Sequence, residues 1–219
     1  MARTGAGSCR VGYTPGVDPG HERCPRCLLQ QRVCLCADIP TIETRTQVVI
    51  VRHHLERHRS SNSGRLAHLA LASSVLVDHG GAGGPARLPP LDGAWLVYPI
   101  GEPRHVPPVP PPRQLIVLDA TWSQARRMFR KLDALRGLPI LHLPPAPMPA
   151  ARLRESPGPG QVSTIEAIAR ALRLLEGEPP AAALEALFAL AVARAAATGR
   201  NLPAAGPRPE PGDGGSSPG

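Results

Sequence analysis

One short aliphatic run constrains the fold of this chain more than any other feature of its sequence. Leu115–Leu118 is continuous and apolar, which is typical of a strand buried on both faces of a parallel sheet. The run ends at Asp119, and a helical pattern follows that is apolar on one face and basic on the other. Ligands of open α/β sheets bind beyond the carboxyl ends of strands. The polar residues after this run are therefore predicted to form a site.

Three further apolar runs predict strands of the same kind. They are Gln47–Arg52, Ala94–Pro99 and Ile140–Leu143. The stretch Val75–Leu91 is rich in Gly and Pro, and we interpret it as a connection that carries a short apolar piece. The expected fold class is α/β, with a mostly parallel sheet and flanking helices. The polar clusters after the strands should then converge on one edge of the sheet.

Two helix starts offer free backbone N–H groups to an anionic ligand. Asn62 or Ser63 can cap a helix that contains Arg65. Ser163 and Glu166 form an S-x-x-E capping box before a second apolar-periodic segment. Capping alone would explain these polar residues, and contact with a cofactor is the functional alternative.

Four cysteines lie close together near the N-terminus with the spacing C-x2-C-x6-C-x-C. They are Cys24, Cys27, Cys34 and Cys36. Four thiolates at this spacing match a tetrahedral site that suits Zn²⁺. An iron–sulfur cluster and unliganded reduced thiols are the alternatives. The metal can simply pin the N-terminal segment, although arginines interleave with the ligands and the knuckle could contact nucleic acid.

The charge of the chain and its lack of targeting signals bound its partners. A formal net charge of +8 predicts a polyanionic partner, although codon bias would account for part of the arginine excess. No apolar run approaches the roughly 20 residues of a membrane span, and the N-terminus lacks an apolar signal segment. We therefore expect a cytoplasmic protein with reduced thiols, no membrane association and no obligate protein partner.

The sequence divides into four segments. Residues 1–21 are predicted to be a disordered leader, 22–40 a zinc knuckle, 41–199 one α/β domain and 200–219 a disordered tail. Within the α/β domain, the glycine loop 158–160 precedes the second capped helix and could cradle a cofactor.

From Cys24 to Val192, the ordered motifs resemble those of the DTW-domain family. The motifs are the four cysteines, His53-His54-Leu55-Glu56, Asn62-Ser63-Gly64-Arg65-Leu66-Ala67, Tyr98-Pro99, Asp119-Ala120-Thr121-Trp122-Ser123-Gln124-Ala125-Arg126-Arg127-Met128, and Ser163-Thr164-Ile165-Glu166-Ala167. Two positions depart from the family pattern: His54 stands where Pro is usual, and Ser63 where Thr is common.

The resemblance implies a tRNA-uridine aminocarboxypropyltransferase. Such enzymes transfer the 3-amino-3-carboxypropyl group of S-adenosylmethionine to N3 of a uridine in tRNA, which forms acp3U and releases 5′-methylthioadenosine. The implied fold is related to the SPOUT methyltransferases, with a knotted C-terminal cofactor site. The alternatives are another S-adenosylmethionine-dependent RNA-modifying enzyme, either a SPOUT-like methyltransferase or one with an rRNA target, and a non-catalytic zinc-knuckle RNA-binding protein.

The matching motifs and their chemistry assign candidate roles to individual residues. The candidate catalytic residues are Asp119, Thr121, Trp122 and Ser123. The candidate residues for binding S-adenosylmethionine are Tyr98, Pro99, Arg65, Ser163, Thr164 and Glu166. The candidate contacts to RNA are His53, Glu56, Asn62, Arg126, Arg127, Arg130 and Lys131.

The role of the central acid has two interpretations. Uridine N3 is a poor nucleophile while protonated, so Asp119 could act as the general base if burial raised its pKa, or it could hold the loop in place. Trp122 could stack on a base or plug the core. The hydroxyls of Thr121 and Ser123 could contact uracil carbonyls or cap the following helix.

Overall fold

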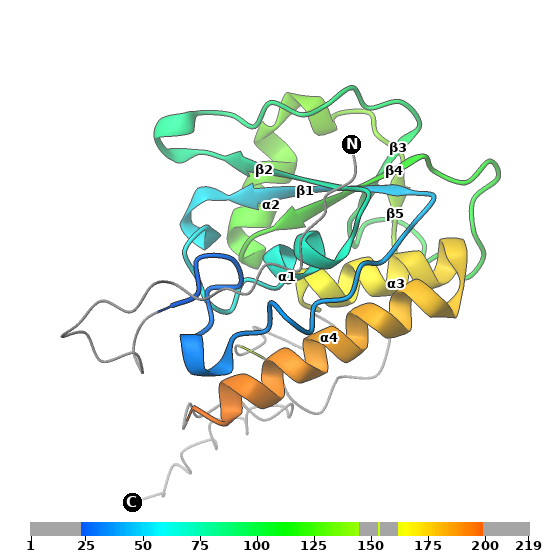
Figure 1. Cartoon of the computed structure of the whole chain (residues 1–219). Helices are drawn as coiled ribbons and strands as arrows, with labels where there is room; N and C mark the ends of the chain where they lie inside the picture. The colour runs from blue at the N-terminus through cyan, green and yellow to red at the C-terminus, as the bar shows by residue number, and fades with distance from the viewer. Residues whose placement is uncertain (1–22, 145–152, 154–161, 199–219) are drawn as a thin grey trace, which may run out of the picture.

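The computed structural model describes residues 23–144, 153 and 162–198, and it shows a parallel sheet with helices on both faces (Figure 1). The strands are β1 (Gln47–His53), β2 (Ser74–His79), β3 (Ala94–Val97), β4 (Gln114–Asp119) and β5 (Ile140–Leu141). Their order across the sheet is β2-β1-β4-β3-β5, and each neighbouring pair is parallel. The predicted α/β class and parallel sheet are confirmed.

The position of the two central strands, buried on both faces of the sheet, explains why their sequences do not alternate between apolar and polar residues. β1 and β4 pair along their length, from Gln47 opposite Gln114 to Arg52 opposite Asp119. Helices cover both faces of the sheet here, so successive side chains of each strand enter two different cores. This pairing also brings the carboxyl ends of both strands, and the polar residues after them, to the same edge.

One predicted connection is a strand. Ser74–His79 overlaps the segment Val75–Leu91, which was expected to be a Gly/Pro-rich connection, and it pairs with β1 over six residues as the edge strand β2. All six of its residues are only partly buried. Its apolar run is short, Val75–Val77, and polar residues follow it. The sequence signal was correspondingly weak, and pairing with β1 supplies the missing backbone partners. β5 is also shorter than predicted and ends at Leu141.

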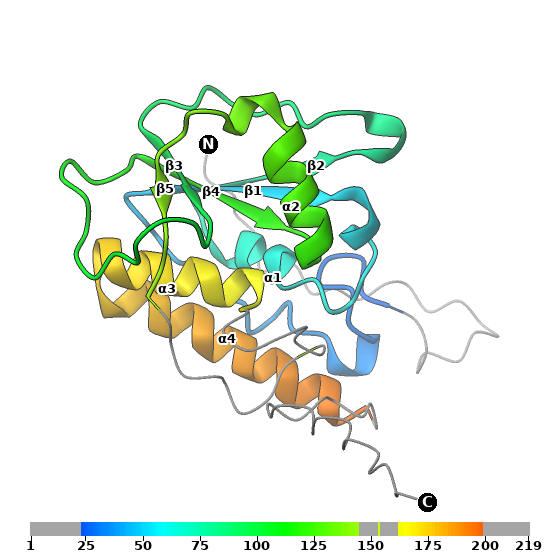
Figure 2. The same ribbon diagram turned by 180° about the vertical axis from the view of Figure 1, so that it is seen from behind.

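The four α-helices lie on opposite faces of the sheet. They are α1 (Ser63–Ala70), α2 (Trp122–Lys131), α3 (Thr164–Glu176) and α4 (Glu178–Ala196), and the short 3₁₀ helices are η1 (Gln31–Val33), η2 (His54–Glu56), η3 (Gly81–Gly83) and η4 (Asp133–Leu135). α2 covers one face, while α1 and α3 cover the other and α4 packs beneath them (Figure 2).

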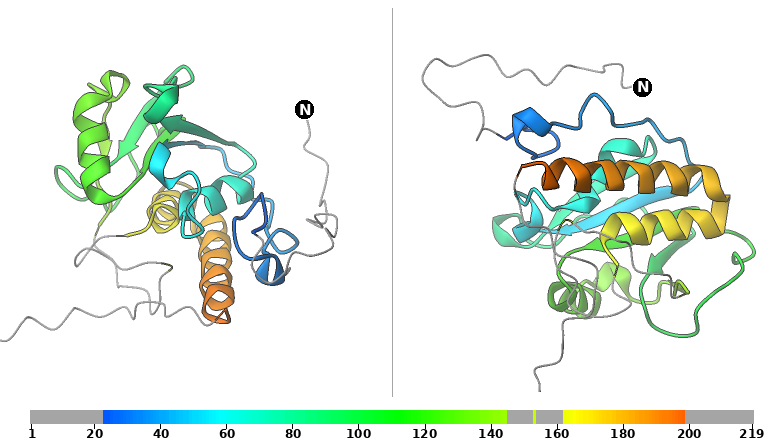
Figure 3. Two further views of the ribbon diagram at one scale, coloured as in Figure 1. Left: turned by 90° about the vertical axis from the view of Figure 1, so that its left-hand side faces the viewer. Right: turned by 90° about the horizontal axis from the view of Figure 1, so that it is seen from below.

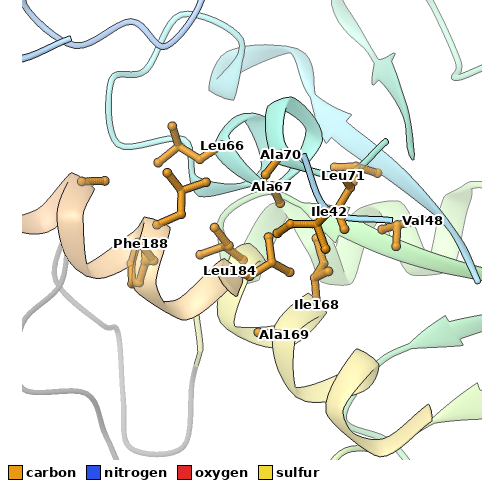
Figure 4. Close-up of a cluster of buried hydrophobic side chains, with 14 of the residues drawn as sticks. Ile42, Val48, Leu66, Ala67, Ala70, Leu71, Ile168, Ala169, Leu184 and Phe188 are labelled. Atoms are coloured by element: carbon orange, nitrogen blue, oxygen red, sulfur yellow. The ribbon is translucent and has the colours of Figure 1, made fainter. Parts of the chain in front are cut away.

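Two hydrophobic cores result, one on each face of the sheet. The larger core contains Val48 and Ile50 of β1 together with apolar residues of α1, α3 and α4 (Figure 4). The smaller core contains Val49 and Val51 of β1 packed with residues that include Met128 of α2. The period-2 alternation of strand side chains thus assigns neighbouring valines and isoleucines to different cores.

Helix α4 corrects one expectation about apolar segments. Its 19 residues are long and apolar enough to cross a membrane by length and composition. One face of the helix, however, is buried in the larger core through residues such as Leu184 and Phe188. Near its end, Arg194 pairs with Asp38 at 2.7 Å. These contacts are those of a core helix, which passes the same test of length and composition.

The N-terminal part of the described chain packs beside α1 and α4 (Figure 3). The predicted leader and tail, residues 1–21 and 200–219, lie outside the described residues, as does the glycine loop 158–160. The knot implied by the resemblance depends on the path of the chain between β5 and α3, where residues 145–152 and 154–161 also lie outside the described residues. The knot therefore stays a prediction.

Candidate functional site

The carboxylate of Asp119 lies at the end of β4 and is buried, with 1% of the residue exposed. Its two oxygens accept hydrogen bonds from two different helix starts. Asn62 Nδ2 donates to Oδ2 at 2.5 Å, and Thr164 Oγ1 donates to Oδ1 at 2.8 Å. Asp119 therefore joins β4 to the N-termini of α1 and α3.

The two helix starts are built to receive this carboxylate. Asn62 is the N-cap of α1, and its Oδ1 accepts a hydrogen bond from the backbone N–H of Arg65 at 2.7 Å. The two helix starts also contact each other, since Ser63 Oγ accepts from Ile165 N at 3.4 Å. The positive ends of two helix dipoles favour a negative charge at this point. This geometry supports the interpretation that Asp119 holds the loop in place.

Gly64 is required by the close approach of α1 to Asp119. A Cβ at position 64 would lie 2.5 Å from Asp119 Cγ, a distance shorter than any ordinary contact. In the sequence, Gly64 stands out only as part of a motif, and no role was predicted for it. A glycine directly after the cap residue, in a helix start near a buried acid, was the signal available.

The turn after β4 is fixed by a capping box. Thr121 is the N-cap of α2: its Oγ1 accepts from Gln124 N at 3.4 Å, and Gln124 Oε1 accepts from Thr121 N at 2.8 Å. The capping interpretation of Thr121 is confirmed. Ser123 lies in the first turn, with its Oγ 3.3 Å from that of Thr121, and its side chain is on the surface.

An open pocket of about 730 Å³ lies between α2 and the segment after β3. It collects residues that were predicted for different roles, together with Phe129 and Ile100, to which no role was assigned. The lining residues are Tyr98, Pro99, Ile100, Trp122, Ser123, Arg126, Arg127, Phe129 and Arg130. Lys131, the next residue along α2, is not among those lining residues. The pocket thus combines aromatic surface with three guanidinium groups.

One wall of the pocket is a stacked pair of rings. Tyr98 and Phe129 lie with their centroids 4.4 Å apart and their planes at 10°. Burial, the largest influence, raises the pKa of the Tyr98 hydroxyl, while Arg126 and Arg130 act in the opposite direction. The hydroxyl therefore stays protonated at neutral pH and can donate a hydrogen bond.

At the end of β1, His53 is held as a neutral donor. Its Nδ1 accepts from Leu55 N at 3.3 Å, so the proton of the neutral ring is on Nε2. Burial, followed by the charges of His54 and His79, lowers the pKa of His53. The neutral ring can donate a hydrogen bond to a carbonyl oxygen at neutral pH.

Two of the predicted RNA contacts are buried inside the protein. Glu56 is fully buried, with Arg59 Nε 3.4 Å from its Oε1. Asn62 is 3% exposed and bonds to Asp119 as described above. Both side chains have partners within the protein, and their contact with RNA stays a prediction.

Two candidate donor-binding groups also have internal partners. Arg65 donates from Nη1 to the carbonyl oxygen of Arg26 at 3.3 Å and from Nη2 to that of Arg57 at 2.7 Å. The predicted box at the start of α3 is present, with Glu166 Oε2 accepting from Ser163 N at 2.7 Å. Through Thr164, this helix start lies directly beside Asp119.

The four cysteine Sγ atoms all lie within 4.8 Å of one another. Cys24 and Cys36 are 3.5 Å apart, and Cys27 and Cys34 are 3.7 Å apart. Sulfurs in a tetrahedral set around zinc are separated by about 3.8 Å, so the cluster can hold the predicted ion. Burial raises the pKa of the Cys27 thiol to about 11, and a bound cation would favour the thiolate that ligation requires.

Comparison with known proteins gave one family and several relatives. The family described as the DTW domain matches residues 21–196. The protein named tRNA-uridine aminocarboxypropyltransferase 2 of Drosophila melanogaster is 27% identical over 77% of this chain and 72% of its own length. Its namesake in Macaca fascicularis is 29% identical over 73% of this chain and 59% of its own length. The protein named tRNA-uridine aminocarboxypropyltransferase A of Arabidopsis thaliana is 28% identical over 73% of this chain and 75% of its own length. No solved structure matches the chain.

Proposed function

Because the chain belongs to the DTW-domain family, we propose that it is a tRNA-uridine aminocarboxypropyltransferase. The names of its relatives state this activity for those proteins. The observation that carries the proposal is the position of Asp119-Ala120-Thr121-Trp122. The acid is buried at the meeting point of β4, α1 and α3, and three residues later the tryptophan lines a basic, aromatic pocket.

The pocket fits an unstacked nucleotide and its phosphates. A volume of about 730 Å³ is typical of a small-molecule site. The three arginines of α2 can bind phosphate oxygens with paired donors, and Trp122 offers a surface on which a base can stack. We propose that the target uridine binds there, with the neighbouring phosphates on Arg126, Arg127 and Arg130.

We propose S-adenosylmethionine as the donor, with N3 of uridine as the acceptor. The proton on N3 passes to the solvent, N3 forms a bond to the aminocarboxypropyl carbon, and the bond from that carbon to sulfur breaks to release 5′-methylthioadenosine. Tyr98 and Pro99 on one side of β4, and the backbone at Ser163 and Thr164 on the other, are the proposed donor contacts. The first-turn N–H groups of α3 suit the carboxylate of the donor.

For Asp119 we propose positioning as its role in catalysis. Both of its oxygens already accept hydrogen bonds, and the bonds orient the turn from which Trp122 enters the pocket. Thr164→Val tests this role because it removes one bond and keeps the carboxylate. Positioning predicts a fall in turnover of about tenfold or more with tRNA affinity retained. Wild-type turnover in this variant would contradict it.

Zinc bound by the four cysteines would be structural. All four ligand positions are filled by protein sulfur, so no position is open to a water or a substrate. The chemistry that zinc supplies is confined to fixing the N-terminal segment against α1 and α4.

Incubation of the purified protein with unmodified tRNA and S-adenosylmethionine tests the activity. Mass analysis of digested tRNA should show uridine carrying the aminocarboxypropyl group, with 5′-methylthioadenosine as the co-product. A methylated nucleoside with S-adenosylhomocysteine would refute the proposal in favour of a methyltransferase. Modification of rRNA but not of tRNA would identify rRNA as the substrate. Binding of tRNA without any product would indicate a non-catalytic RNA-binding protein.

Variants in the pocket test where the RNA binds. Arg127→Gln should weaken tRNA binding and reduce the salt slope of log K by about 0.7–0.9, the value for one phosphate contact. Arg136→Gln is the matched control because this arginine is 71% exposed and pairs with Asp133 outside the pocket. Trp122→Ala should lose turnover and Trp122→Phe should keep most of it, since a phenyl ring still stacks. Equal effects of the two arginine variants would refute the proposed RNA site.

A further inference from the structure

A continuous path of hydrogen bonds connects the four-cysteine cluster to Asp119. Arg26 lies between the ligand positions Cys24 and Cys27, and its carbonyl oxygen accepts from Arg65 Nη1 at 3.3 Å. The backbone N–H of Arg65 donates to Asn62 Oδ1 at 2.7 Å. Asn62 then donates from Nδ2 to Asp119 at 2.5 Å. A single residue, Arg65, thus bonds to the knuckle with its side chain and to the cap of α1 with its backbone.

Arg65 also fixes the connection that leads into α1. Its Nη2 donates to the carbonyl oxygen of Arg57 at 2.7 Å, so one guanidinium group bridges two backbone carbonyls from separate segments. A planar guanidinium can hold both acceptors at once, while the ammonium of a lysine cannot reproduce this fork. The start of α1, which carries Asn62, is therefore held from the knuckle side and from the β1 side.

The knuckle has a second anchor that does not lead to the site. Arg194 of α4 donates to the carbonyl oxygen of Cys34 and pairs with Asp38 at 2.7 Å. Regular structure in the knuckle is sparse, with one bridge between Arg23 and Gln30 and the three-residue helix η1. An ion bound by the four sulfurs would therefore supply much of the order of this segment, including the position of the Arg26 carbonyl.

We infer that Arg65 is a positioning residue through which metal binding at the four cysteines orders the Asn62–Asp119 contact. The consequence for catalysis rests on the proposed function, while the coupling between the two sites does not. Coupling between two sites is reciprocal in free energy. Metal binding tightens the Asp119 contact, and loosening that contact from the far side weakens metal retention.

The test measures metal release and backbone order in the full-length, zinc-loaded protein, without any activity assay. Zinc release into a chromophoric chelator is followed by absorbance, and amide hydrogen exchange is followed by mass spectrometry. The variants are Arg65→Met, which keeps side-chain length and removes the donors, Arg65→Lys and Thr164→Val. Arg32→Lys is the matched control: Arg32 lies in the knuckle, and its bonds, to Gln30 and Thr198, do not lead to Asp119.

Release from Arg65→Met should be about fivefold to tenfold faster than from the wild type, as expected for loss of one or two carbonyl hydrogen bonds. The rate of zinc release from Arg65→Lys should lie between those of the wild type and Arg65→Met. Thr164→Val should also speed zinc release, by a smaller factor, although Thr164 lies at the start of α3 and not in the knuckle. Arg32→Lys should release zinc at close to the wild-type rate.

Hydrogen exchange locates the coupling. In Arg65→Met, exchange should rise in peptides that cover Asn62–Arg65 and Thr164–Ile165, while the centre of β4 stays protected, which shows that the fold is intact. The inference is overturned if Arg65→Met and Arg32→Lys release zinc at the same rate, or if the rise in exchange stays within the knuckle. Because neither readout uses turnover, failure here is distinguishable from failure of the proposed activity.

Discussion

Gly64→Ala is the substitution that most directly tests the buried contact at Asp119. The added Cβ would lie 2.5 Å from Asp119 Cγ and 2.7 and 2.8 Å from its two oxygens. Ordinary contacts between such atoms are roughly 3.5–4.0 Å, and the surrounding residues are buried. The carboxylate must therefore move by about 1 Å or α1 must shift away from the sheet.

The cost follows from the bonds that such a shift breaks. A displacement of about 1 Å disrupts the bond from Asn62, the bond from Thr164 or both, and each hydrogen bond to a charged group contributes roughly 1.5–3 kcal/mol. Alanine recovers about 1 kcal/mol relative to glycine within a helix. Loss of one bond should therefore lower the free energy of unfolding by about 0.5–2 kcal/mol, and loss of both by about 2–5 kcal/mol, which corresponds to a fall in Tm of roughly 4–20 °C.

Thermal and urea unfolding measure this loss, with Gly83→Ala as the matched control. Gly83 has no atom within 4 Å of the position of an added Cβ, so its variant should stay within about 0.5 kcal/mol of the wild type. The two variants make the same chemical change in different surroundings. If Gly64→Ala were as stable and as active as the control, the close approach of α1 to Asp119 would be refuted.

Three further outcomes are expected. Burial and a neighbouring imidazole lower the pKa of His53 and of His79. The unfolded chain therefore binds more protons than the folded protein in mild acid, and the free energy of unfolding should fall as the pH drops below about 6.5. In a pH series of Tm, a His53→Gln/His79→Gln double variant should show a smaller fall than the wild type. Thr121→Ala should cost about 1 kcal/mol through loss of the N-cap of α2, and Ser123→Ala should cost clearly less; equal costs would contradict the capping role. Glu176→Gln should cost about 1–2 kcal/mol in urea unfolding because its carboxylate accepts two backbone N–H bonds at 2.8 and 3.1 Å, and an unchanged midpoint would show that these bonds are dispensable.

The sequence predicted the central elements well because their signals are local. The aliphatic runs of β1 and β4 need burial on both faces, and this requirement alone selects a parallel α/β sheet. The caps at Asn62 and Thr121 are equally local, since each cap residue bonds to a backbone group within its own first turn. The edge strand β2 was missed because its partly buried run carries little of this signal.

The arrangement of the candidate site was only partly predictable. Convergence of polar residues at the carboxyl ends of β1 and β4 follows from parallel pairing, and Asp119 was recognised on that ground. That Asn62 and Thr164 both bond to this carboxylate could not be inferred, because these residues are separated from it by 57 and 45 positions. Only the packing of two helix starts over one strand end brings them together.

The sequence by itself determined the fold class, the helix starts, the cysteine cluster and the family, since each depends on residue types at short or fixed spacing. The tertiary structure decided what those residues contact. It showed that Asp119 accepts hydrogen bonds from two helix starts, gave Gly64 its role, and connected Arg65 to the cysteine cluster. Such contacts join segments far apart in the chain, and they depend on the packing of whole elements, which no local pattern encodes.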